Sequence, residues 1–161
     1  MGFALSDMQL QSTAFAAHGM IPRRHTGEGE DVAPALSWTR LPKGTQSLAL
    51  VVHDPDAPVI SGNSYGFVHW VLYNIPANVA ALPGGMQGYT SGVNDFGHAR
   101  YNGPMPPPGH GMHHYYFLLF ALDEDLRLAA GLTMWQLLEK IGPHVIGMNR
   151  LVGTYERRAA S

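Results

Sequence analysis

The sequence predicts a mainly β fold made of one domain, and three observations support this. Of its 161 residues, 45% are hydrophobic and 14% are charged, which favours a single sizeable core over disorder. Nineteen glycines and twelve prolines are spread along the chain, as is typical of short strands joined by turns. Several apolar runs are rich in β-branched and aromatic residues, which favour strands. We therefore expect residues 1–161 to form one β-rich domain.

Three apolar runs are expected to be the central strands. Ser47–His53 reads S-L-A-L-V-V-H and is followed by D-P-D-A-P, where the prolines end strand pairing. Phe67–Ile75 is stopped in the same way by Pro76. Tyr115–Leu122 has no polar break, so both of its faces are expected to be covered.

Alternation along a strand predicts which side chains share a face. In Phe67–Ile75 it separates two sets of side chains: Phe67, His69, Val71 and Tyr73 on one face, and Val68, Trp70 and Leu72 on the other. The same rule places His113 and His114 on opposite faces, so at most one of them faces any given pocket. Tyr115 is expected to share the face of His113.

The remaining elements are predicted from shorter patterns. Edge or terminal strands are expected at Phe3–Gln11, Ala35–Thr39 and Asn149–Tyr155. The one clear helix is Thr133–Ile141, because Thr133 and Gln136 have the spacing of a capping box and Lys140 suits the dipole of the last turn. Pro143 is expected to begin a second short helical turn.

Acidic and imidazole side chains gather where the predicted strands end. They are Asp54, Asp56, His69, His110, His113 and His114. The stretch N-G-P-M-P-P-P-G-H-G at 102–111 is stiffened by proline, and would present histidines at the rim of a small-molecule pocket. Each residue also has a structural interpretation, since the aspartates can close a turn and His69 can be a hydrogen-bonded core histidine. The residues alone leave both interpretations open.

Composition and motifs exclude several classes of function. Without cysteine there is no thiolate nucleophile and no disulfide. A nucleophile elbow, an H-E-x-x-H motif and a phosphate-binding glycine loop are missing. The net charge of −2 offers no basic field for nucleic acid. No apolar run approaches the roughly 20 residues of a membrane helix and no signal peptide is evident, so we expect a cytoplasmic protein.

The acidic and imidazole groups also raise the question of a metal. Two carboxylates near two imidazoles are ligand types that bind Zn²⁺, Mn²⁺ or Fe²⁺. The spacing of His110, His113 and His114 fits the usual pairs of metal ligands poorly. We therefore expect neither a metal nor a cofactor.

Several blocks of sequence carry a family resemblance. The main blocks are D-P-D-A-P at 54–58, V-H-W-V-L-Y-N-I-P at 68–76, and G-P, G-H-G and H-H-Y between 103 and 115. Further matches are P-A-L-S-W at 34–38, N-D-F-G at 94–97 and L-V-G-T-Y at 151–155. Together they cover nearly the whole chain, which resembles the phosphatidylethanolamine-binding proteins, also called Raf-kinase-inhibitor-like proteins, in their short bacterial form.

The resemblance implies a two-sheet antiparallel β-sandwich with a helical C-terminal segment and a small pocket for phosphate-like head groups. By position, it implies that the pocket residues are Asp54, Asp56, Pro58, His69, Gly103, Pro104, His113 and Tyr115. It also implies a cis Ala57–Pro58 bond and a homodimer, but not the kinase inhibition of animal members. The family usually has arginine at position 114, so His114 is expected to weaken a pairing on the face opposite the pocket.

We therefore expect a protein that binds small phosphate- or carboxylate-bearing ligands, such as a phospholipid head group, and that regulates a partner protein. His69 and His113 would donate to the anion, Asp54 would orient an imidazole or accept from a ligand ammonium, and no residue would be catalytic. Binding should strengthen as the pH falls through about 5.5–7.5, where unperturbed imidazole gains its proton. The alternative is a hydrolase or metal-dependent enzyme that uses the same cluster.

Overall fold

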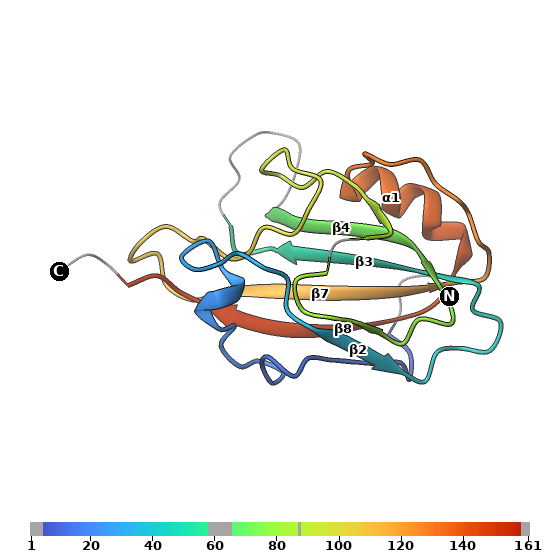
Figure 1. Ribbon diagram of the computed structural model, residues 1–161, viewed down its shortest axis with the longest axis horizontal. Coiled ribbons are helices and arrows are strands. Elements are labelled where there is room, and N and C mark those ends of the chain that lie inside the picture. The colour runs from blue at the N-terminus through green and yellow to red at the C-terminus, as the bar shows by residue number, and fades with distance from the viewer. Residues whose placement is uncertain (1–4, 58–65, 87, 159–161) are drawn as a thin grey trace.

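The computed structural model describes residues 5–57, 66–86 and 88–158, which form two antiparallel sheets and one α-helix (Figure 1). The larger sheet has the strand order β6-β4-β3-β7-β8. Its strands are β3 (Ser47–Asp54), β4 (Phe67–Pro76), β6 (Thr90–Ser91), β7 (His113–Leu122) and β8 (Val145–Tyr155). The smaller sheet, in the order β1-β2-β5, consists of β1 (Gln9–Gln11), β2 (Leu36–Thr39) and β5 (Ala81–Leu82). The predicted mainly β, two-sheet fold is confirmed.

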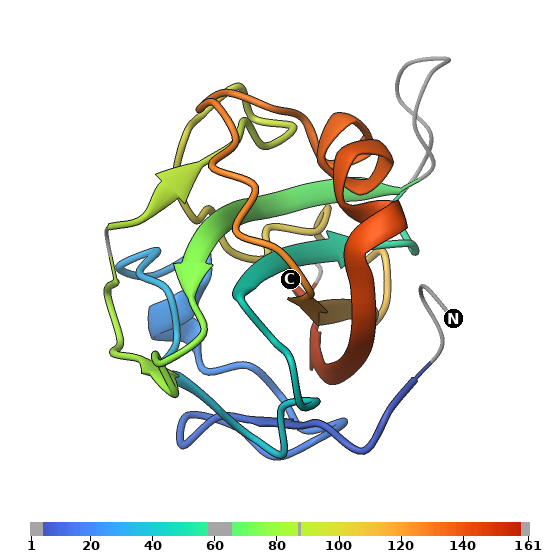
Figure 2. The ribbon, with the colours of Figure 1, turned by 90° about the vertical axis from the view of Figure 1, so that its right-hand side faces the viewer.

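The larger sheet is covered on both faces. One face packs against the smaller sheet through a hydrophobic core that includes Trp38, Trp70 and Phe117. The other face packs against the helix α1 (Met134–Ile141), whose Leu137 and Ile141 are fully buried. Figure 2 shows the helix and the smaller sheet on either side of the larger one. This double cover explains why the central strands are apolar at nearly every position.

The predicted helix and central strands are confirmed, with small shifts at their ends. Thr133 caps α1 and forms the expected reciprocal capping box with Gln136. A short 3-10 helix, η2 (Gly142–His144), follows with Pro143 inside it; the other 3-10 helix is η1 (Arg23–His25). The last strand begins at Val145 rather than Asn149, and in the described part of the strand expected at Phe3–Gln11, residues 5–11, only β1 is a strand. No helix among the described residues is long and apolar enough to cross a membrane.

The predicted alternation along β4 is wrong at its beginning. Val52 pairs with Trp70 and His53 pairs with Val68, so His69 is an extra, unpaired residue of β4 between the partners of two consecutive residues of β3. Such a β-bulge turns the side chains that precede it to the other face. Val68 accordingly packs in the core beneath the helix, whereas His69 contacts Tyr115, a residue of the core between the sheets. The bulge therefore moves His69 to the face that carries the site.

Candidate ligand-binding site

Three strands of the larger sheet bring the candidate residues together at one end. Because β3 is antiparallel to both β4 and β7, the end of β3 lies beside the beginnings of its two neighbours (Figure 1). A pocket of about 240 Å³ opens at this edge. It is lined by Asp54, Ala57, Phe67, His69, Phe96, Met105, Pro106, Pro107, His113 and Tyr115. The proline-rich loop thus forms one wall of the pocket and the strands form the opposite wall.

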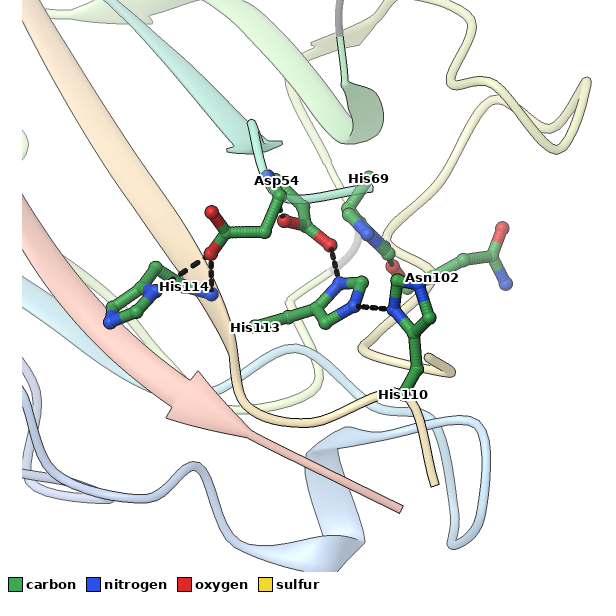
Figure 3. Close-up of polar contacts among 7 residues, drawn as sticks. Asp54, His69, Asn102, His110, His113 and His114 are labelled. Carbon is green, nitrogen blue, oxygen red and sulfur yellow. Dashed lines mark hydrogen bonds and ion pairs between the residues drawn. The ribbon is translucent and has the colours of Figure 1, made fainter. Parts of the chain in front are cut away.

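His113 is the less exposed of the two histidines that line the pocket. Its Nδ1 lies 2.6 Å from Oδ2 of Asp54, and the side chains of both residues are only 3% exposed. Its Nε2 lies 2.7 Å from Nδ1 of His110, an exposed residue of the proline-rich loop (Figure 3). Burial raises the pKa of Asp54 even though the hydrogen bond and charge of His113 act in the opposite direction. Asp54, His113 and His110 therefore form a hydrogen-bonded chain from the interior to the surface.

His69 is held in a single orientation by the backbone of the neighbouring loop. Its Nδ1 lies 2.8 Å from the carbonyl oxygen of Asn102, which can only accept, so Nδ1 carries the proton. Burial lowers the pKa of His69 to about 4, so the ring is neutral near pH 7. In this state Nε2 has a lone pair and no proton. The expectation that His69 donates to an anion between pH 5.5 and 7.5 is therefore wrong; His69 offers an acceptor.

Tyr115 supplies the remaining polar atom of the pocket wall. The residue is 1% exposed, and its ring lies edge-on to that of His69, with centroids 5.3 Å apart. Burial raises the pKa of its hydroxyl, which stays protonated as a donor. Neither this hydroxyl nor Nε2 of His69 has a hydrogen-bond partner among the described residues. The pocket therefore contains one donor and one acceptor that are both unpaired.

Not all of the predicted site residues line this pocket. Asp56 turns away from it and accepts from both the backbone N–H (2.8 Å) and Nδ1 (2.7 Å) of His114. Its own backbone N–H donates to Oδ1 of Asp54 at 2.8 Å, so the anticipated aspartate turn is present as well. Gly103 and Pro104 are buried and are not among the lining residues. Pro58, and with it the predicted cis bond, lies outside the described residues.

Gly103 has a structural reason to be glycine. A Cβ at this position would lie 2.0 Å from the carbonyl oxygen of His25. Its N–H donates to Oδ1 of Asp31 at 2.6 Å, and the side-chain amide of Asn102 donates to Oδ2 of the same residue at 3.0 Å. Asp31 therefore fixes the loop whose carbonyl orients His69. No local sequence pattern indicated this role, because Asp31 lies more than 70 residues before its partners.

Asn94 and Phe96 were also missed as contributors to the site. The Asn94 amide donates to the carbonyl oxygen of His69 at 3.2 Å and to Oδ1 of Asn102 at 2.8 Å. The Phe96 ring stands edge-on to Phe67, with centroids 4.7 Å apart, and is 43% exposed at the mouth of the pocket. The N-D-F-G match at 94–97 was the sequence signal that could have identified them.

A larger cavity lies elsewhere in the molecule. It has a volume of about 580 Å³ and is lined in part by Asp31, Trp70, Tyr89, Arg100 and Tyr101. Its two acidic residues are already engaged, Asp31 with the loop and Glu30 with Arg24 at 3.6 Å. The smaller pocket is the better candidate, because unpaired polar atoms and a coupled Asp–His pair converge there. Among the residues that the structure describes, no group of three acidic or imidazole side chains is arranged to hold a metal ion.

Comparison with known proteins agrees with this architecture. The family model described as phosphatidylethanolamine-binding protein matches residues 11–156. A UPF0098 protein of Methanothermobacter thermautotrophicus is 40% identical over 157 residues, which cover 93% of this chain and 99% of the relative. LppC of Mycobacterium tuberculosis, which carries a lipoprotein name, is 39% identical over 155 residues, or 95% of this chain and 74% of the relative.

Solved structures give the same result. A phosphatidylethanolamine-binding protein homologue of Chlamydia trachomatis is 38% identical with a TM-score of 0.86, covering 93% of this chain and 97% of its own. YbcL of Escherichia coli, described as a new member of the mammalian family, is 30% identical with a TM-score of 0.85, covering 94% and 99%. The chain belongs to the phosphatidylethanolamine-binding protein family.

Proposed function

We propose that this protein binds a small ligand with a phosphate or carboxylate group in the pocket formed by Asp54, His69, His113 and Tyr115. The observation that carries the proposal is a pair of polar atoms on two residues that line the pocket, Nε2 of His69 and the Tyr115 hydroxyl, neither of which has a hydrogen-bond partner among the described residues. A ligand that fills the pocket would take both atoms out of water, and polar groups buried in this way are nearly always hydrogen-bonded.

The two unpaired atoms define what the ligand must bring. The Tyr115 hydroxyl requires an acceptor, such as a phosphate or carboxylate oxygen. The neutral His69 ring requires a donor, because its Nδ1 proton is already used by Asn102. A fully ionised phosphodiester satisfies only the first requirement. A protonated phosphate monoester satisfies both, as does a phosphodiester whose head group carries an ammonium.

The walls of the pocket fit an ammonium as well as an anion. Phe67, Phe96 and Tyr115 present aromatic rings, and cations are attracted to the faces of such rings. Among the described residues that line the pocket, Asp54 has the only acidic side chain. A zwitterionic head group of the phosphoethanolamine type therefore matches this pocket better than a bare anion does.

Calorimetric titration with three probes at pH 6 tests the proposal. Methyl phosphate carries a proton in part at this pH, glycerophosphoethanolamine carries an ammonium, and dimethyl phosphate carries no donor. We expect the first two to bind roughly tenfold more tightly than dimethyl phosphate, because leaving a buried acceptor unpaired costs about 1–3 kcal/mol. Absence of binding by all three probes would refute the proposal.

Two variants assign the effect to the pocket. His69→Ala removes the acceptor and should abolish measurable binding of glycerophosphoethanolamine. His144→Ala removes a histidine paired with Asp123 just beyond the opposite end of β7, and should bind like the wild type. Equal binding by His69→Ala would assign this histidine a purely structural role.

An enzymatic function is the second candidate, and the Asp54–His113 pair is the observation that favours it. A carboxylate bonded to Nδ1 of an imidazole is the orienting half of many catalytic sites. However, Nε2 of His113 meets His110, and among the lining residues that the structure describes only Tyr115 carries a hydroxyl. Turnover of nitrophenyl esters and phosphates that is lost in His113→Ala would support an enzyme, as would a stoichiometric metal in the purified protein.

We further propose that the protein resides in the cytoplasm, forms a homodimer and regulates a protein partner. Because LppC carries a lipoprotein name, the location can be tested by lipid labelling: incorporation of lipid into the expressed protein would contradict a cytoplasmic location.

One edge of the larger sheet is partly occupied, because the segment around Met20 hydrogen-bonds with β8. Dimerisation would therefore use another surface, and light scattering at tens of micromolar should give twice the monomer mass.

A further inference from the structure

His110 is carried by a short turn rather than by a strand. The flanking residues Gly109 and Gly111 have φ angles of 74° and 93°, which glycine adopts far more readily than other residues. The N–H of Gly109 donates to the carbonyl oxygen of Arg157 at 2.9 Å, and the N–H of His110 donates to that of Pro107 at 3.1 Å. The imidazole itself is exposed. Its orientation can therefore change without disturbing a strand or the core.

The His110 ring occupies the last free position on His113. One nitrogen of His113 is bonded to Asp54 and the other lies 2.7 Å from Nδ1 of His110 (Figure 3). The nitrogen–nitrogen distance is that of an N–H···N hydrogen bond, and the two rings are inclined at 56° with their centroids 4.9 Å apart. A ligand atom that is to meet Nε2 of His113 must take the place of this nitrogen.

We propose that His110 is a displaceable internal ligand, whose ring leaves Nε2 of His113 when an anionic oxygen of the ligand arrives. The inference rests on the proposed function of the pocket. The exposed His110 ring is hydrated when it leaves, so its displacement costs little. The Asp54–His113 pair remains buried and in place, because separating it would leave an uncompensated charge in the interior.

The exchange of His110 for a ligand oxygen requires protons on particular nitrogens of His113. With Asp54 ionised, Nδ1 of His113 donates to it, and an oxyanion at Nε2 requires a second proton there. That proton, whichever of the two rings carries it before binding, is then donated to the oxyanion in a charge-assisted hydrogen bond, which is stronger than the bond between the two imidazoles. The other ionisable groups around the two rings are Asp56, His69, Tyr115, Tyr155 and the Arg157–Glu28 pair.

The main experiment is calorimetric titration of wild type and His110→Ala with glycerophosphoethanolamine at pH 6.5. Removing the internal competitor should lower the Kd about threefold or more, since the ligand no longer breaks a hydrogen bond to enter. His144→Ala is the matched control and should leave the Kd unchanged. An unchanged or higher Kd in His110→Ala, with wild-type binding intact, overturns the role of His110 and leaves the proposed function standing.

A second experiment tests without any ligand whether His110 covers His113. Diethyl pyrocarbonate acylates imidazole nitrogens that are accessible and unprotonated, so the labelling is done at pH 8, where an ordinary imidazole is neutral, and mass spectrometry locates the product. In the wild type we expect His110 to be labelled and His113 to be protected, whereas in His110→Ala the labelling of His113 should accelerate about fivefold or more. Equal protection of His113 in both proteins would overturn the proposal even if no probe binds.

Discussion

Two aspartate–histidine pairs lie side by side at the edge of β3 and β7, and they differ mainly in burial. Asp54 and His113 are 2.6 Å apart, with both side chains 3% exposed. Asp56 and His114 are 2.7 Å apart, with side chains 41% and 44% exposed. Alternation along β7 sends the two histidines to opposite faces, as the sequence predicted. The same contact chemistry thus occurs once inside the protein and once at its surface.

The two carboxylates have pKa shifts of opposite sign. For Asp54, burial is the largest influence and raises the pKa against the opposing hydrogen bond from His113. For Asp56, burial acts in the same direction but is outweighed by the hydrogen bonds from the ring and backbone of His114, so the pKa is lowered. A short Asp–His distance therefore does not fix the ionisation of a pair. The exposed pair joins two segments of chain at the surface, whereas the buried pair holds an ionisable hydrogen bond inside the protein.

The largest expected difference between the pairs is in stability. His113→Leu leaves the Asp54 carboxylate buried without its main partner, which should cost roughly 3–5 kcal/mol of unfolding free energy at pH 8. The loss should shrink as the pH falls, because the raised pKa of Asp54 allows the carboxylate to be neutralised first. Urea unfolding at pH 8 and pH 5 measures both effects.

His114→Leu is the matched variant of the exposed pair. It should cost less than about 1 kcal/mol, because solvent screens the interaction that is lost. Equal losses in the two variants would show that burial does not distinguish the pairs.

The next largest effect concerns His69, which is buried without a carboxylate. Its pKa of about 4 lies below the unfolded value of 6.5, so the unfolded chain takes up the proton first as the pH falls. Stability should therefore decrease between pH 6.5 and 4, by roughly 3 kcal/mol in total. The raised pKa of Asp54 acts in the opposite sense, since it favours the folded state as the pH falls.

The difference between wild type and His69→Gln isolates this contribution. The variant should lose less stability than the wild type over the interval from pH 6.5 to 4 in urea unfolding. Parallel stability curves for the two proteins would mean that His69 is not buried in its neutral form.

A smaller effect is expected in the pH dependence of binding. The charge of glycerophosphoethanolamine is constant between pH 6 and 8, so a change in its affinity reports on the protein. We expect binding to be roughly tenfold tighter at pH 6, because an ordinary imidazole gains its proton over this interval and a doubly protonated ring donates a charge-assisted hydrogen bond to the phosphate. His69→Gln should keep this ratio because His69 is neutral at both values and glutamine retains an acceptor. His113→Gln should abolish the difference in affinity between pH 6 and pH 8, whereas His114→Gln should keep it. Loss of this difference in His69→Gln would contradict the assignment of the pH dependence to His113.

The sequence predicted the parts of the fold that depend on local pattern. Long apolar runs identified the central strands, and the Thr133–Gln136 spacing identified the beginning of α1. Family motifs indicated four residues that line the pocket: Asp54, His69, His113 and Tyr115.

Features that depend on distant contacts were not predictable. The bulge at His69 follows from the pairing of β4 with β3 and reverses the alternation expected for Val68. The tautomer of His69 depends on a carbonyl oxygen 33 residues away, at Asn102. The contact between His110 and His113 depends on a turn that Arg157 helps to hold. In each case the deciding partner lies outside any local sequence window.

The smallest expected effect comes from restoring the residue usual for the family at position 114. The guanidinium introduced by His114→Arg would keep a permanent charge and could bind the Asp56 carboxylate with two hydrogen bonds. The gain in unfolding free energy should be about 0.5 kcal/mol or less, because both side chains of the present pair are more than one third exposed. It should be larger at pH 8, where an ordinary imidazole is neutral, than at pH 5.5, where it is charged. It should also disappear in 1 M salt, where the Debye length is only about 3 Å. Urea unfolding at the two pH values and two salt concentrations measures the difference, and a gain above about 2 kcal/mol that resists salt would mean that this pair is shielded from solvent after all.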